Sequence, residues 1–181
     1  VAVSAYGVIS TTTLGSATAT VDLTSIPQTY TDLVAVVKAQ DSNGYLFVRF
    51  NSDSSSLYSR TYMSGNGTSA SSARGTGEAQ GYTTADTTSN LSNVGLLNIM
   101  NYSNATTFKT FIGRENLPAS AVQATVGLYR STSAITTVSF LSPSATATIA
   151  VGSIFTSNHR CEKKVDSVCF PGNPCVNVEA L

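Results

Sequence analysis

Short segments in which apolar and polar residues alternate recur along the whole chain. Residues 17–23, with the sequence Ala-Thr-Ala-Thr-Val-Asp-Leu, place small or apolar side chains at every second position. Because successive side chains of a strand point to opposite faces, this alternation predicts a strand with one buried face. The periodicity of an amphipathic helix is almost absent. The pattern therefore predicts an all-β protein.

Two apolar segments separated by turn residues are predicted to form a β-hairpin. Residues 32–38 are a nearly continuous apolar run rich in β-branched side chains, and residues 45–50 follow after a turn at 41–44. Similar patterns predict further strands near residues 6–12, 57–63, 94–102, 108–114, 122–129, 135–141 and 147–155. About ten short strands separated by turn signals are typical of an antiparallel β-sandwich with jelly-roll character.

Residues 64–93 differ from the rest because glycine, serine and asparagine leave little to bury. This composition predicts a long surface loop, most simply a solvated crossover between two sheets. The alternative is a contact loop that binds a partner through Asn66, Tyr82 and Asn90.

The alternation stops near the C-terminus. We expect a β-sandwich domain over residues 1–156 and an irregular arm over 157–181, which lies on a neighbouring subunit or on the body. All three cysteines, Cys161, Cys169 and Cys175, lie in this arm. An odd count leaves three alternatives: one disulfide with a free thiol, an intermolecular disulfide, or three thiols.

Composition supports a folded domain with an unusual surface. Hydrophobic residues make up 41% of the 181 residues, which suffices for a core without disulfide support. Charged residues make up only 11%, against about 25% in an ordinary domain. The formal net charge is zero and no run of like charge occurs, so nucleic acid is not expected as a partner. The longest apolar runs are far too short to span a bilayer, so no membrane association is expected.

No pattern of residues indicates catalysis. The single histidine, His159, lies in the expected arm, which argues against a Ser-His-Asp triad in the body. The body carboxylates form no close acid-base motif, although a glycosidase pair could be assembled in space. His159 and the three cysteines lack the spacing of a zinc site, so neither metal nor cofactor is expected.

Tyrosines near strand ends suggest a second kind of binding. Their rings could stack on neutral sugars, with half-burial at sheet edges as the simpler interpretation. The tyrosines concerned are Tyr45, Tyr58, Tyr62, Tyr82 and Tyr102.

Several segments resemble a β-rich module of tailed bacteriophages, particularly those of cyanobacteria and other aquatic hosts. The resemblance covers about residues 3–155 and is carried by Ser25–Val34, Val48–Asn51, Tyr58–Ser59, Gly65–Ser72, Asn101–Asn104, Lys109–Thr110 and Val126–Thr136. The resemblance implies a virion structural protein, and it carries over no catalytic residue. Arg49 and Arg130 match positions of the module, where we expect them to pair with carboxylates or to cap loops.

From this resemblance we expect a non-enzymatic protein on the surface of a phage particle, made in the host cytoplasm. The leading hypothesis is a capsid decoration (cement) protein that binds the major capsid protein as a homo-oligomer, with a trimer as the expected state. The alternative is a tail-fibre or receptor-binding module, bound to tail proteins, that recognises host surface glycans.

Overall fold

The computed structural model describes residues 6–41, 46–84, 93–117, 121–143 and 148–160, together with 167–168 and 176–177. These residues form strands and turns and contain no helix. The strands are β1 (Tyr6–Thr13), β2 (Thr20–Leu23), β3 (Leu33–Ala39), β4 (Leu46–Phe50), β5 (Tyr58–Gly65), β6 (Ala70–Glu78), β7 (Gly81–Thr84), β8 (Asn93–Met100), β9 (Lys109–Leu117), β10 (Ala121–Tyr129), β11 (Val138–Leu141), β12 (Ile154–Arg160), β13 (Ser167–Val168) and β14 (Val176–Asn177).

The strand order is that of a jelly roll with two inserted hairpins. The larger sheet has eight strands in the order β1-β12-β3-β8-β9-β10-β5-β6, and the smaller has four in the order β2-β11-β4-β7. With the hairpins β5–β6 and β9–β10 set aside, the pairs β1–β12, β2–β11, β3–β8 and β4–β7 are nested in the sequence. This nesting is the double Greek key of a jelly roll. The predicted fold class, an antiparallel β-sandwich, is confirmed.

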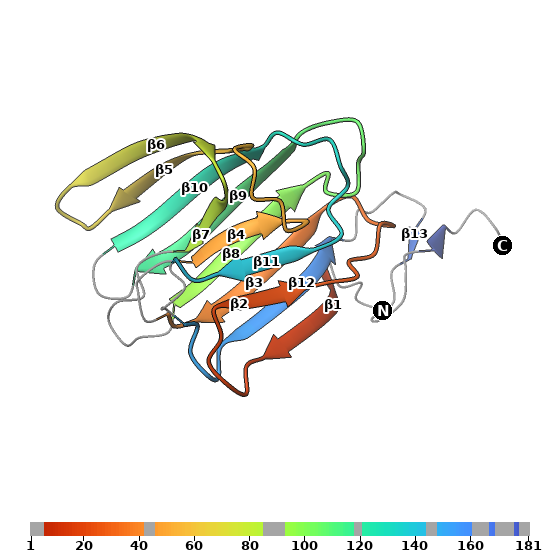
Figure 1. The fold of residues 1–181 in the computed structure, drawn as a ribbon, viewed down its shortest axis with the longest axis horizontal. Helices are drawn as coiled ribbons and strands as arrows, with labels where there is room; N and C mark the ends of the chain where they lie inside the picture. The colour runs from red at the N-terminus through yellow and green to blue at the C-terminus, as the bar shows by residue number, and fades with distance from the viewer. Residues whose placement is uncertain are drawn as a thin grey trace.

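The smaller sheet covers only part of the larger one. In Figure 1 strands β2, β11, β4 and β7 lie over the middle of the larger sheet, and the hairpin β5–β6 extends beyond them at the upper left. Every second residue of β3 faces the smaller sheet, so Leu33, Ala35, Val37 and Ala39 are all buried in the common core. On β6, by contrast, almost every residue is exposed or only half-buried.

An aromatic cluster joins the two sheets at the point where the inserted hairpins begin. Phe50 of the smaller sheet lies with its ring centroid 5.5 Å from those of Phe111 and Tyr129, and 6.0 Å from that of Tyr58. All four side chains are at most 1% exposed. Full burial of an aromatic side chain contributes roughly 1.5–3 kcal/mol, so this cluster is a main source of stability.

The predicted hairpin of residues 32–38 and 45–50 is wrong, because its two segments lie in different sheets. β3 pairs with β12 and β8, whereas β4 pairs with β11 and β7. Both segments are apolar because each is the buried strand of its own sheet. A run of apolar residues does not identify the partner of a strand.

The predicted loop over residues 64–93 is also wrong, because it contains β6 and β7. β6 is an edge strand paired only with β5, and its serines and glycines remain exposed. Small polar residues are compatible with an edge strand that buries neither face, so the composition that predicted a loop did not exclude a strand.

The body of the fold extends beyond the expected boundary at residue 156. β12 continues to Arg160 between β1 and β3, so residues 157–160 belong to the larger sheet. Its inward-facing residues after Phe155 are Ser157 and His159, which is why the apolar alternation stops before the strand does. The cysteines Cys161, Cys169 and Cys175 lie outside the described residues. Within the expected arm, β13 and β14 pair with each other.

His159 is therefore part of the body and not of an arm. It is 5% exposed, and its imidazole ring stacks on the ring of Tyr30 with 3.7 Å between centroids and 4° between planes. Gly7 on the neighbouring strand leaves room for this ring, because a Cβ atom there would lie 2.1 Å from its Nε2 atom. Burial lowers the pKa of His159 from its usual value of 6.5.

We expect Gly127→Ala to destabilise the protein by about 1–3 kcal/mol, because a side chain at this position overpacks the core. The new Cβ atom would lie 2.0 Å from Cζ of Phe111, whose ring is fixed in the aromatic cluster. Urea unfolding followed by circular dichroism measures the loss. Gly15→Ala is the matched control, because nothing lies within 4 Å of its Cβ position. Equal stability of both variants would contradict the packing described for Phe111.

We expect the stability to fall as the pH is lowered through about 6.5, because unfolded His159 then binds a proton that the folded chain binds only at lower pH. The measurement is the free energy of unfolding between pH 7.5 and roughly pH 5, above the range in which carboxylates titrate. The variant His159→Gln should be less stable at pH 7.5 and should lose part of the pH dependence. An unchanged slope in that variant would show that another group is responsible.

Candidate functional site

One face of the larger sheet points away from the smaller sheet, and we call it the outer face. Side chains directly opposite each other on paired strands lie on the same face of a sheet. The register connects a row across six strands through Arg74, Thr61, Val126, Ile112, Asn98 and Val34. The alternate residues of these strands, such as Phe111 and Tyr129, face the core.

The outer face carries most of the exposed large apolar side chains among the described residues. Eight such side chains are exposed, and six of them occupy outer positions of the larger sheet: Tyr6, Val8, Met63, Val94, Val122 and Val126. Their exposed fractions lie between 49% and 65%. A single exposed valine is ordinary. Met63, Val122 and Val126, however, lie on the adjacent strands β5 and β10 and form a patch of the kind that marks an interaction site.

Charge is also distributed unevenly over the larger sheet. The outer positions of its described strands carry four exposed cations, Lys38, Arg74, Arg114 and Arg160, and no acidic residue. Both acidic residues of these strands, Glu78 and Glu115, lie opposite inward-facing residues and so face the other way. The outer face is therefore apolar and cationic, although the whole chain has no net charge.

A groove of about 340 Å³ lies in the outer face where β6, β5, β10 and β9 run side by side. Its lining includes two arginines: Arg60, which is paired with Glu78, and Arg74. Apolar side chains of Val126 and Leu128 and several hydroxyl groups make up most of the rest. The complete lining is Ser59, Arg60, Thr61, Arg74, Thr110, Val126, Gly127 and Leu128. Such a mixture suits a partner group that is partly apolar and carries a negative charge.

Arg130 supports one wall of this groove. Its guanidinium donates to Oγ of Ser59 at 3.0 Å and to the carbonyl oxygens of Ser56 and Tyr58 at 3.4 Å each. Arg130 therefore holds the chain that enters β5, which is the loop-capping role expected for it. Arg49 likewise donates to the side-chain oxygen of Gln80, at 2.9 Å. Neither arginine forms an ion pair among the described residues.

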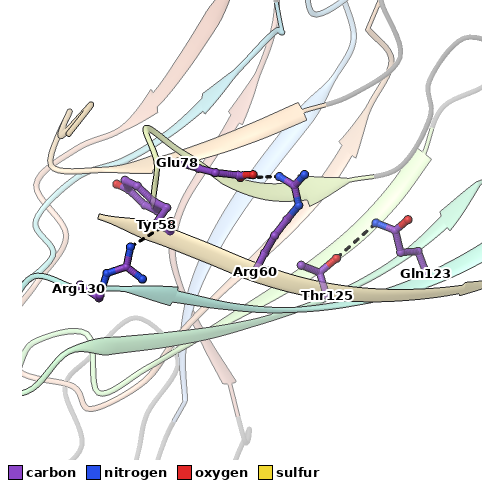
Figure 2. Close-up of polar contacts among 6 residues, drawn as sticks. All are labelled: Tyr58, Arg60, Glu78, Gln123, Thr125 and Arg130. Atoms are coloured by element: carbon purple, nitrogen blue, oxygen red, sulfur yellow. Dashed lines mark hydrogen bonds and ion pairs between the residues drawn. The ribbon is translucent and has the colours of Figure 1, made fainter. Parts of the chain in front are cut away.

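On the opposite side of β5, Arg60 points toward Glu78 of β6, as Figure 2 shows. Its Nη1 atom lies 2.6 Å from Oε2 of Glu78, and its Cζ atom lies 3.2 Å from the centre of the Tyr82 ring. Gly75 is the strand partner of Arg60, and a Cβ atom there would collide with the Glu78 carboxylate at 2.0 Å. The glycine thus allows the ion pair, which joins β5 to β6, and the stacking of the same guanidinium on Tyr82 connects this hairpin to β7.

Three ionisable groups, Lys109, Asp53 and Tyr129, are held by structural hydrogen bonds. Nζ of Lys109 donates to the carbonyl oxygens of Thr107 and Thr132, and burial lowers its pKa. Hydrogen bonds from Ser55 and then Tyr129 lower the pKa of Asp53. Burial, reinforced by the bond to Asp53, raises the pKa of Tyr129 to about 12. These groups stabilise loops, and none of them faces the groove.

Two of the three residues proposed for a contact loop are described, and each has a structural role. Asn66 caps the β5–β6 turn, where its Oδ1 atom accepts hydrogen bonds from the backbone and hydroxyl groups of Thr68 and Ser69. Tyr82 lies in β7, with its ring edge-on to Phe47 and stacked on Arg60. Asn90 lies outside the described residues.

The proposed sugar-stacking tyrosines also need correction. Tyr58 and Tyr102 are fully buried, so their rings are core side chains and not exposed platforms. Tyr62 and Tyr82 are half-buried, as the simpler interpretation expects. Tyr45 lies outside the described residues.

Comparison with known proteins gives no relative: the chain matches no protein family, no curated protein and no solved structure. Within the described ranges, no three histidine, cysteine or acidic side chains are grouped so that they could hold a metal ion. The same residues include no helix long and apolar enough to cross a membrane.

We expect Arg60→Ala to destabilise the protein by about 1–3 kcal/mol, because it removes a partly buried ion pair and the contact with Tyr82. Chemical denaturation measures the change, and a double-mutant cycle with Glu78→Gln isolates the ion pair. Arg114→Ala is the control, because an exposed strand position should change stability by less than about 0.5 kcal/mol. A similar loss in both variants would argue against the anchoring role of Arg60.

Proposed function

We propose that this chain is a non-enzymatic structural protein of a tailed-phage particle that binds other virion proteins through the outer face. Its most suitable place is the capsid surface, where it acts as a decoration (cement) protein that stabilises the lattice. The observation that carries this proposal is the concentration of exposed apolar side chains on one broad, regular face. A face of this kind is suited to binding a surface and is not shaped like a catalytic cleft.

The size of the outer face fits this use. Eight strands spaced about 4.8 Å apart, each of about eight residues at roughly 3.3 Å per residue, give an area of roughly 1,000 Å². Stable protein interfaces bury about 800 Å² on each partner. One outer face is therefore large enough for a specific contact with a capsid protein.

Two features of the sequence also support a virion role. The resemblance to the phage module extends over most of the body, and its segments include the end of β10, from Val126 on, where β10 runs through the outer face. The low charged fraction of 11% leaves few surface charges for salt to screen, which suits a particle that persists in changing media.

A receptor-binding role at the tail is the second candidate, favoured by the groove. Its hydroxyl groups and Arg74 could bind a sugar that carries a carboxylate. The absence of an aromatic side chain from the lining weakens this alternative, because sugar rings usually stack on aromatic rings.

We expect the purified protein to bind particles that lack it in a fixed ratio to the major capsid protein and to raise their resistance to heat. Gel densitometry of sedimented particles gives the copy number, and light scattering gives the oligomeric state, for which a trimer is expected. Val122→Asp should weaken binding at least about tenfold, because it places a charge in the apolar patch.

Val151→Asp is the matched control, because Val151 is exposed to nearly the same extent, 64% against 65%, but lies in the turn before β12. Its binding should equal that of the wild type. A few copies per particle, or retention on host cells instead, would transfer the assignment to the tail. Equal effects of the two substitutions would exclude the outer face as the contact.

A further inference from the structure

We propose that the partner presents an acidic protein surface with an apolar centre, and that one of its carboxylate side chains enters the groove and pairs with Arg74. This inference rests on the proposed function, since it specifies the chemistry of the surface that the outer face binds.

The sign of the charge on the outer face identifies the kind of partner. Its four exposed cations have no acidic counterpart on the outer positions of the described strands. A second copy stacked face to face would oppose like charges, which costs free energy at an interface. A partner with carboxylates around an apolar centre would match both the charge and the exposed valines.

Arg74 is the cation best placed to give specificity. The other five arginines of the described residues have assigned roles or lie away from the groove. Arg49 and Arg130 hold loops, and Arg60 pairs with Glu78. Arg114 lies in a neighbouring row, and Arg160 lies at the end of β12 beside β1. Arg74 lines the groove, and no carboxylate of the described residues lies within ion-pair distance of it. Its backbone is fixed by pairing with Thr61, so the guanidinium extends from a rigid strand.

The rest of the groove matches a carboxylate carried on an apolar stem. Val126, 52% exposed, and Leu128 provide an apolar floor on which the methylene groups of a glutamate could pack. The hydroxyl groups of Thr61 and Thr110 can donate hydrogen bonds to the carboxylate oxygens that Arg74 does not bind. Arginine is among the residues enriched at interface hot spots, and its guanidinium can bind a carboxylate through two parallel hydrogen bonds.

The first experiment compares particle binding of the wild type with that of Arg74→Gln, Arg74→Lys and Arg114→Gln. We expect Arg74→Gln to weaken binding about tenfold to a hundredfold, and Arg74→Lys to restore only part of it, because lysine keeps the charge but not the two-bond geometry. Arg114→Gln should weaken binding less, since its charge acts only at a distance. Asp22→Asn, an exposed charge on the smaller sheet, should have no effect.

The second experiment needs no partner. Isovalerate, a branched apolar carboxylate, is titrated into isotopically labelled protein, and isoamyl alcohol serves as its neutral counterpart. We expect shifts in the NMR signals of Thr61, Arg74 and Val126 with isovalerate, much weaker shifts with the alcohol, and loss of the isovalerate response in Arg74→Gln. Arg74→Gln should leave the fold intact, because Arg74 is exposed on the edge strand β6. Unchanged NMR signals of residues away from the groove would confirm this.

The outcomes separate the two proposals. If the wild type binds particles and Arg74→Gln binds equally well, the inference is wrong and the proposed function stands. If no variant binds particles, the proposed function fails, and the isovalerate titration alone decides whether the groove binds carboxylates. Equal responses to the acid and the alcohol, or a response that survives in Arg74→Gln, would overturn the inference.

Discussion

The contact of the Phe111 ring with two glycines joins the jelly roll to its extension. A Cβ atom at Gly127 would lie 2.0 Å from the ring, and one at Gly81 would lie 2.6 Å from it. Gly127 belongs to the larger sheet and Gly81 to the smaller, so the ring is enclosed between the two sheets at the edge of the smaller one. The approach of β7 to β9 and β10 therefore depends on the absence of two side chains. The anchoring of Arg60 by Glu78 and Tyr82 depends in turn on this approach.

This packing has a consequence for the rest of the surface. Because β9, β10, β5 and β6 continue the larger sheet past the smaller one, the sheet is wide and its outer face has no layer of described strands upon it. The core-facing side chains of the extension pack in the aromatic cluster or surround the Arg60 guanidinium. What remains exposed is a face that bears valines, a methionine and only positive charge. The same strands that enlarge the fold thus create its interaction surface.

The all-β class and most strands could be predicted from the sequence, because alternation reports which face of a strand is buried. The partners of the strands could not be predicted, since residues 32–38 and 45–50 are apolar for the same reason in different sheets. β6 escaped prediction because an edge strand that buries neither face needs no apolar residues. The end of β12 escaped because its inward residues are Ser157, which lies 2.9 Å from the hydroxyl of Ser10, and His159, which stacks on Tyr30. In both places the constraint is a contact with a residue distant in the sequence.

The outer face illustrates the same limit for the site. Val94, Val122 and Val126 are ordinary strand residues in the sequence, and Arg74 and Arg114 are two isolated charges separated by about a quarter of the chain. A signal was present in β10, where Val122, Val126 and Leu128 alternate with the inward-facing Thr125 and Tyr129, so that neither face of the strand is fully polar. An alternating strand exposed to water should have a polar outer face, and this one does not. The strand register sets Arg74 opposite Thr61 and Thr61 opposite Val126. Only this register shows that the exposed valines and the arginines lie on one surface. The net charge of zero does not reveal this arrangement. Among the described residues, the acidic side chains are turned toward the inside of the fold or lie outside the strands of the larger sheet.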